Sequence, residues 1–424
     1  MSADIVVIII FSVMGLAAHG ARKQPWIEWT LRVIYCFAFV AELWTAFVVL
    51  PSRDGSEAVA SAWSVGVTAV MATLTGLILF RPCRIGMSYA LSAMNDLVSG
   101  QLLYGAYWVK KTPVTVLTTF PDPHVPEPIA PAVLTQDPSL GDASTETVPQ
   151  HAAPAETMAS PAVAPHGVRT LVRQESLVGT AAPIIGAKSW RDYWLFDRVF
   201  VADSIPHLNG MWIYITVLGS LLANINLENF AAPMIGIPFP VPLDSLISYN
   251  FLGLVLLAVS GCGILISRSP KETMKRLGLV KPAGWHIGIA VLMVFVTATY
   301  DFLWNPSGAG VGGKLAMYNA GTFAAAGGNP GPAAFLALMT GVCAGAGEEI
   351  LMRGALQPVL GIVPAAILHG ALHGQFQHAP ILILQVAGWS ILMGIVRRYT
   401  NTTTTLITHA TWNFITTFLF AFNP

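Results

Sequence analysis

Long apolar runs are the feature of this sequence that most limits what the chain can fold into. A helix that crosses the hydrocarbon layer of a membrane needs about 17–25 mostly apolar residues. Only 10% of the 424 residues are charged, against about a quarter in soluble domains, which excludes a soluble enzyme. The sequence therefore predicts an all-α, polytopic transmembrane helix bundle. About ten spans are predicted, at residues 4–19, 30–50, 60–80, 208–227, 247–267, 284–304, 332–350, 362–376, 379–396 and 403–422.

The placement of lysine and arginine predicts how the spans are oriented, because short cytoplasmic loops collect positive charge. The loops at 268–281 and 397–398 are both basic, and an even number of predicted spans separates them. We therefore expect both loops in the cytoplasm, both chain termini outside, and the protein in the plasma (cytoplasmic) membrane. The 22 Lys and Arg balance the 22 Asp and Glu, so no basic field indicates a nucleic-acid partner.

Three regions are predicted along the chain. Residues 1–111 hold three spans and the mixed apolar and polar stretch 85–107, which is typical of an amphipathic helix on the cytoplasmic surface. Residues 112–187 hold 12 of the 29 prolines and few aromatic residues, which predicts a disordered cytoplasmic linker. Residues 188–424 hold the other seven spans. Because a flexible linker transmits no fixed geometry, we expect the N-terminal unit to be separable at modest cost.

Ionisable residues gather in the last four predicted spans. A charged group inside the bilayer costs roughly 2.5–3.5 kcal/mol, so each one needs a partner or a function. Away from their ends, the N-terminal spans hold Glu42 as their one charged residue. The C-terminal group comprises Glu348, Glu349, Arg353, His369, His373 and His409, with Asn413 beside them. This concentration indicates a site built inside the membrane.

The spacing of these residues predicts different roles for the two glutamates. Glu349 and Arg353 are four residues apart, so on a helix they share a face and can pair. Glu348 is rotated by about 100° from Glu349 and points elsewhere. We expect Glu349 to be a structural anchor and Glu348 to act as a base. The same spacing recurs in two later pairs, His369 with His373 and His409 with Asn413.

Together these patterns resemble the CAAX prenyl protease and bacteriocin-processing family of intramembrane proteases. The family signatures are EExxxR, FxxxH and HxxxN. The matching residues are Glu348, Glu349 and Arg353 in the first, His373 in the second, and His409 and Asn413 in the third. His369 stands at the phenylalanine position, where it would line the substrate cleft. The resemblance makes 188–424 the expected catalytic transmembrane domain, with its motif core at 344–414.

The resemblance implies an endopeptidase that hydrolyses a peptide bond of a membrane-associated protein or peptide within the lipid bilayer, without a cofactor. Carried onto this chain, Glu348 would activate water with help from His373. His409 and Asn413 would stabilise the oxyanion of the tetrahedral intermediate.

Two alternatives remain at this stage. One is a zinc site drawn from Glu348, His369, His373 and His409, which is disfavoured because no HExxH motif is present. A zinc site made of cysteine thiolates is not indicated either, because the four cysteines lie far apart without a CxxC pair. The same spacing indicates no disulfides. The other alternative is a non-proteolytic scaffold or transporter with the same fold. The presence of all the motif residues favours the enzyme, because placing ionisable groups inside the membrane costs free energy.

Overall fold

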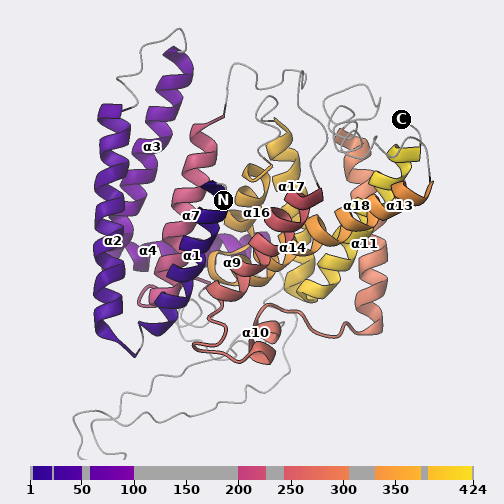
Figure 1. Cartoon of the computed structure of the whole chain (residues 1–424), viewed down its shortest axis with the longest axis horizontal. Helices are drawn as coiled ribbons and strands as arrows, with labels where there is room; N and C mark the ends of the chain where they lie inside the picture. Colours follow the sequence, from indigo (N-terminus) through magenta and orange to yellow (C-terminus); the bar gives the residue numbers. More distant parts are fainter. Residues whose placement is uncertain are drawn as a thin grey trace, which may run out of the picture. The chain divides into compact units, whose positions relative to one another are not determined.

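The computed structural model describes residues 3–21, 23–49, 58–99, 199–225, 243–304, 330–373 and 381–422. These residues are all-helical, with no strand among them (Figure 1). The predicted linker at 112–187 lies outside the described residues, so its predicted disorder stays a prediction.

Four of the helices that the structure describes come from the N-terminal part of the chain. They are α1 (Ala3–Gly20), α2 (Pro25–Trp44, continued by the π-helical turn η1 at Thr45–Val49), α3 (Ala58–Leu79) and α4 (Arg81–Val98). Helix α2 starts at a proline, which suits the first turn because the N–H that proline lacks would be unpaired there.

The remaining helices follow in the C-terminal part. The first are α7 (Ile205–Ala223), the continuous run α8 (Leu243–Ser245), η3 (Leu246–Gly253) and α9 (Leu254–Gly261), then α10 (Pro270–Arg276) and α11 (Gly284–Trp304). A second run joins α13 (Pro330–Thr340), η5 (Gly341–Ala346), α14 (Gly347–Glu349), η6 (Ile350–Leu356) and α15 (Gln357–Leu360). The last three helices are α16 (Ile362–Ala371), α17 (Ile381–Tyr399) and α18 (Thr402–Phe422).

Six segments of the described residues are long and apolar enough to cross a membrane. They are Pro25–Val48, Ala62–Leu79, Ile205–Ala223, Leu243–Gly261, Gly284–Trp304 and Gly331–Leu360. Phe37 is 72% exposed and Phe295 67% exposed on two of them, as expected for helices whose outer face meets lipid. The chain is thus an integral membrane protein, while the predicted count of about ten spans is not confirmed.

The helical run that contains the span predicted at 332–350 is longer than that prediction. The helical run continues to Leu360 and ends before Gly361, whose φ of 92° is easily reached only by glycine. Glu348 and Glu349 therefore lie well inside the run. A π-helical turn precedes them and another follows them, and such turns are frequent at functional sites.

The amphipathic helix predicted on the cytoplasmic surface is α4, but its polar face does not meet water. Arg84, Ser88, Ser92, Asn95 and Asp96 are all buried. The Arg84 guanidinium donates to the carbonyl oxygens of Ala202 and Ile78, at 2.8 and 2.9 Å. Backbone carbonyls of the same protein, and not solvent, satisfy this face, while the place of α4 at the cytoplasmic surface stays a prediction.

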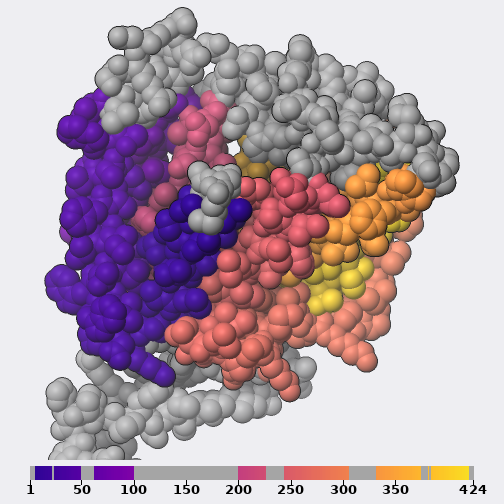
Figure 2. Space-filling model, in the orientation of Figure 1, coloured from indigo at the N-terminus to yellow at the C-terminus, as the bar shows by residue number. Residues whose placement is uncertain are grey.

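The N-terminal helices also contact the C-terminal part of the chain directly. Helix α1 packs against α9, and Figure 2 shows the indigo N-terminal segment in contact with the C-terminal part of the chain. His19 Nε2 lies 3.0 Å from the Gly261 carbonyl oxygen. Asn95 Oδ1 accepts a hydrogen bond of 3.1 Å from the backbone N–H of Ile362. The domain boundaries stay predictions, but the expected modest cost of removing residues 1–111 does not agree with these contacts.

Asn95 supplies a cap that α16 cannot make for itself. The residue before this helix is Gly361, which has no side chain to accept from the first helical N–H groups. We expect Asn95→Ala to lower the free energy of unfolding by about 1 kcal/mol, as for other lost helix caps. Thermal unfolding in detergent measures this, and Asn95→Asp, which keeps an acceptor, is the control. An unchanged Tm for Asn95→Ala would show that the cap contributes nothing.

Candidate active site

Two glycines let neighbouring helices reach the glutamate pair. A Cβ built on Gly345 would lie 3.0 Å from the backbone N and Cα of Ala410, in α18. A Cβ on Gly347 would overlap the carbonyl oxygen of Asn250, in η3. Small residues at helix contacts allow this approach inside membranes. As a result α18, which carries His409, and η3 both pack directly on the helix that carries Glu348.

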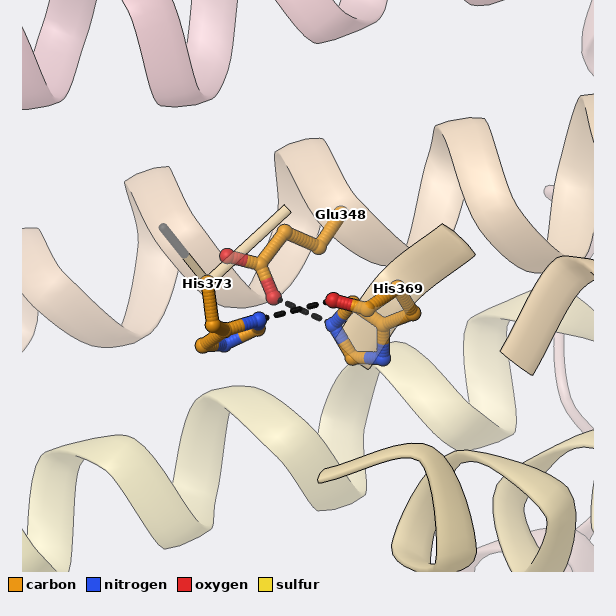
Figure 3. A group of neighbouring side chains, drawn as sticks. All are labelled: Glu348, His369 and His373. Atoms are coloured by element: carbon orange, nitrogen blue, oxygen red, sulfur yellow. Dashed lines mark hydrogen bonds and ion pairs between the residues drawn. The ribbon is translucent and has the colours of Figure 1, made fainter. Parts of the chain in front are cut away.

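Glu348 meets His369 on the wall of a cavity. Its Oε2 lies 2.7 Å from His369 Nε2, and its side chain is 14% exposed (Figure 3). The cavity measures about 140 Å³ and is lined by Asn250, Leu254, Glu348, His369, Leu372 and His373. Glu348 is thus held in place by one hydrogen bond and still faces space that a water molecule can enter.

Glu349 lies in a different environment. Its side chain is 0% exposed, and its Oε2 is 3.4 Å from Nε of Arg353, one turn further along. Its other oxygen, Oε1, is 3.0 Å from Nδ1 of His409. A buried carboxylate needs such partners, because an unpaired charge is costly in an apolar interior. Glu349 is therefore enclosed between a guanidinium and an imidazole and does not line the cavity.

Arg353 sets the tautomer of His369. Arg353 Nη1 is 3.3 Å from His369 Nδ1. Because a guanidinium is only a donor, Nδ1 must accept, and the proton of a neutral imidazole is then on Nε2. That N–H points at Glu348 and donates to its carboxylate. His369 thus connects the buried Arg353 to the carboxylate at the cavity.

His373 lies one turn after His369, at the end of α16. Its Nδ1 is 2.8 Å from the backbone oxygen of His369, so Nδ1 is the protonated nitrogen and Nε2 is an acceptor. His373 lines the cavity together with Glu348. The structure therefore brings His369 of α16 and His373, just after that helix, to Glu348. The one hydrogen-bonded to Glu348 is His369, which occupies the phenylalanine position of the family motif.

Glu348, His369 and His373 are also the residues most able to hold a metal ion. One ligand atom from each lies within 4.8 Å of the others. Coordination by His369 Nε2 would require its proton to move to Nδ1, where Arg353 offers a donor and no acceptor. With Arg353 in place, His369 is therefore the member of this group that is poorly suited to coordinate a cation.

His409 and Asn413 are on α18, four residues apart. His409 Nε2 is 3.9 Å from Glu348 Oε2, so the ring bridges towards both glutamates. Asn413 is partly exposed, and among the described residues its side chain makes no hydrogen bond with either carboxylate. Helical spacing places it on the face of α18 that carries His409.

The sequence motifs did not single out two further residues of the C-terminal helices, Trp389 and Asp301. Trp389 packs edge-on to His409, with ring centroids 4.7 Å apart, and lies 5.6 Å from the guanidinium carbon of Arg353. Its indole N–H donates to Thr297 Oγ1 at 3.0 Å, which fixes the ring. A tryptophan in an apolar span carries no signal of such a contact. Asp301, which accepts from Gln385 Nε2 at 3.2 Å, could have been found by extending the search for ionisable residues to α11.

These features define a class: an integral membrane protein whose helices enclose a centre of two carboxylates, a guanidinium and three histidines. Residues 330–415 match the Rce1-like family, described as type II CAAX prenyl endopeptidase Rce1-like. This segment contains every site residue singled out from the sequence, and the match confirms the resemblance. It indicates a protease of the CAAX type. No curated protein and no solved structure gives a significant match to the chain.

Proposed function

We propose that this chain is an intramembrane endopeptidase that hydrolyses a peptide bond of a membrane-associated substrate. The observation that carries the proposal is the contrast between the two glutamates. Glu348 is oriented by His369 and faces a cavity, whereas Glu349 is fully buried between Arg353 and His409. A general base must reach both water and substrate, and only Glu348 meets that requirement.

In the proposed reaction a water molecule in the cavity donates hydrogen bonds to Glu348 and to Nε2 of His373. Glu348 takes one proton as the water oxygen attacks the carbonyl carbon of the scissile bond. The C=O π electrons move to the oxygen, which becomes the oxyanion. Glu348 then passes its proton to the amide nitrogen, the C–N bond breaks, and an amine and a carboxylic acid leave. His369 acts as a positioning residue that holds Glu348.

His409 and Asn413 are proposed to stabilise the oxyanion. Ionised Glu348 and Glu349 with Arg353 leave one net negative charge in a buried cluster. A proton on His409 neutralises that cluster, because His409 lies 3.0 Å from one carboxylate and 3.9 Å from the other. Protonated His409 also has an N–H on Nε2 to donate to a developing oxyanion.

The alternative function is a non-proteolytic scaffold or transporter. The cavity at Glu348 is small for a transported solute, and the buried charges would then be a cost without a use. An assay of purified protein in liposomes separates the two functions. Membrane-anchored peptides, prenylated and unprenylated, are incubated with the protein, and products are identified by mass spectrometry. A discrete cleavage site supports the protease, while intact peptides in every case contradict it.

We further propose that no metal takes part. The reason is the donor that Arg353 presents to His369 Nδ1, which keeps the proton on Nε2. Cleavage is therefore expected to survive exhaustive treatment with EDTA or phenanthroline. The readout is the initial rate before and after treatment, with a known zinc protease treated in parallel. Loss of cleavage that added zinc restores would contradict this assignment.

For the membrane arrangement we propose about ten spans in the plasma membrane, with both termini outside and the linker in the cytoplasm. Single cysteines at positions 150, 275 and 315 test it in a background where Cys36, Cys83, Cys262 and Cys343 are replaced. A membrane-impermeant thiol reagent on intact cells should label position 315 only. Positions 150 and 275 should react only after permeabilisation. Labelling of 275 from outside would invert the proposed orientation.

A further inference from the structure

Arg397, in the last turn of α17, is a buried cation without a hydrogen-bond or ion-pair partner in the described part of the chain. The residue is only 8% exposed, and its Nε is buried and has no hydrogen-bond acceptor. Among the described residues no carboxylate pairs with it. A buried guanidinium is costly unless an anion or carbonyl groups compensate its charge. The site therefore lacks the group that would compensate it.

Helix capping does not account for this arginine. Basic side chains near helix C-termini commonly bind the last carbonyl oxygens. Arg276, in the last turn of α10, is compensated by another helical segment, since its Nη1 donates to the carbonyl oxygen of Gly354 in η6 at 3.2 Å. Arg397 makes no hydrogen bond of this kind within the described part of the chain.

The charges that act on Arg397 increase its need for an anion. They come from Arg276 on α10 and from its neighbour Arg398, and both are positive. The acidic residue of α10 is Glu272, which is turned outward and binds the N-cap Ser269. Two helices thus bring three guanidinium groups together, and no carboxylate of the described residues acts on Arg397.

A further donor lies at the start of α18. This helix begins at Thr402, after the two-residue turn that follows α17, and its Thr403 and Thr404 N–H groups donate to Gly278 O and Asn401 Oδ1. The Thr402 hydroxyl is buried and has no hydrogen-bond partner among the described residues. A Cβ on Gly278 would lie 2.7 Å from that oxygen, so the chain just after Arg276 packs on this end of α18.

We propose that Arg397, Arg276 and Thr402 form a binding site for a phosphate group, carried by the headgroup of an acidic phospholipid. A guanidinium fork matches phosphate oxygens in shape and charge. The site lies where apolar α17 ends, at the basic and predicted cytoplasmic end of the helices, which is the depth of lipid headgroups. The inference does not depend on protease activity.

The test uses the full chain, purified in a phosphate-free neutral detergent, with thermal unfolding as readout. Phosphatidylglycerol, phosphatidylcholine or inorganic phosphate is added. We expect phosphatidylglycerol to raise the Tm clearly more than phosphatidylcholine, because a ligand stabilises the folded state that binds it. Arg397→Gln should remove most of this difference. Without lipid it should be at least as stable as the wild type, because the uncompensated charge is gone.

Arg81→Gln is the matched control, since it removes an equal charge from an exposed residue that pairs with Asp203 at 2.8 Å. It should keep the full response to phosphatidylglycerol. If Arg397→Gln cannot be purified, Arg276→Gln and Thr402→Val should each weaken the response. A response to inorganic phosphate that Arg397→Gln abolishes supports the phosphate site but replaces the lipid source with a soluble one. Equal responses to both lipids, or an undiminished response in Arg397→Gln, overturn the proposal.

Discussion

Replacing Glu348 by glutamine is expected to reduce peptide cleavage at least about a hundredfold while the protein stays folded. Glutamine keeps the shape of the side chain and can accept from His369 Nε2, so the local packing is preserved. It cannot take a proton from the attacking water at neutral pH. The measurement is the cleavage rate of a membrane-anchored peptide, together with the Tm of the same preparation.

Glu42→Gln is the matched control for this variant. Glu42 is also a buried glutamate in an apolar helix, 7% exposed, and it accepts from Thr216 Oγ1 at 3.4 Å. The same chemical change there should leave the cleavage rate close to that of the wild type. Wild-type turnover by Glu348→Gln would remove Glu348 from the role of base. It would leave open whether another residue of the cavity activates water.

Replacing Arg353 by methionine is expected to lower the free energy of unfolding by about 3–5 kcal/mol. The substitution leaves Glu349 buried with His409 as its remaining partner, and it removes the donor to His369 Nδ1. Activity should fall as well, since His369 is then free to change its tautomer and release Glu348. Unfolding is followed by thermal or denaturant titration in detergent.

Two further variants show whether the effect belongs to the buried pair. Adding Glu349→Gln to Arg353→Met should recover part of the lost stability, because no uncompensated carboxylate remains. Arg32→Met removes a guanidinium with the same i, i+4 spacing, but this pair with Glu28 is exposed by 37% and 35%. It should cost less than about 1 kcal/mol. Equal losses for Arg353→Met and Arg32→Met would contradict a role for burial.

The protein class and the main residues of the site could be predicted from the sequence, because both depend on local properties of the chain. The length and apolar character of a run predict a span wherever the helix packs. The spacing of Glu349 and Arg353 predicts that they share a helical face, and the structure places the two side chains 3.4 Å apart. The motif residues could likewise be identified from the sequence, and all of them lie in the segment that matches the family.

The arrangement around these residues was decided by tertiary structure. Which histidine binds Glu348 depends on how α16 is rotated against the helix that carries the glutamates. In the structure it is His369, whose other ring nitrogen contacts Arg353. The polar face of α4 finds carbonyl groups more than a hundred residues away, such as that of Ala202. Asn95 caps a helix 267 residues further along the chain. Helical periodicity determines which side chains share a face, but only the packing of distant segments determines what that face meets.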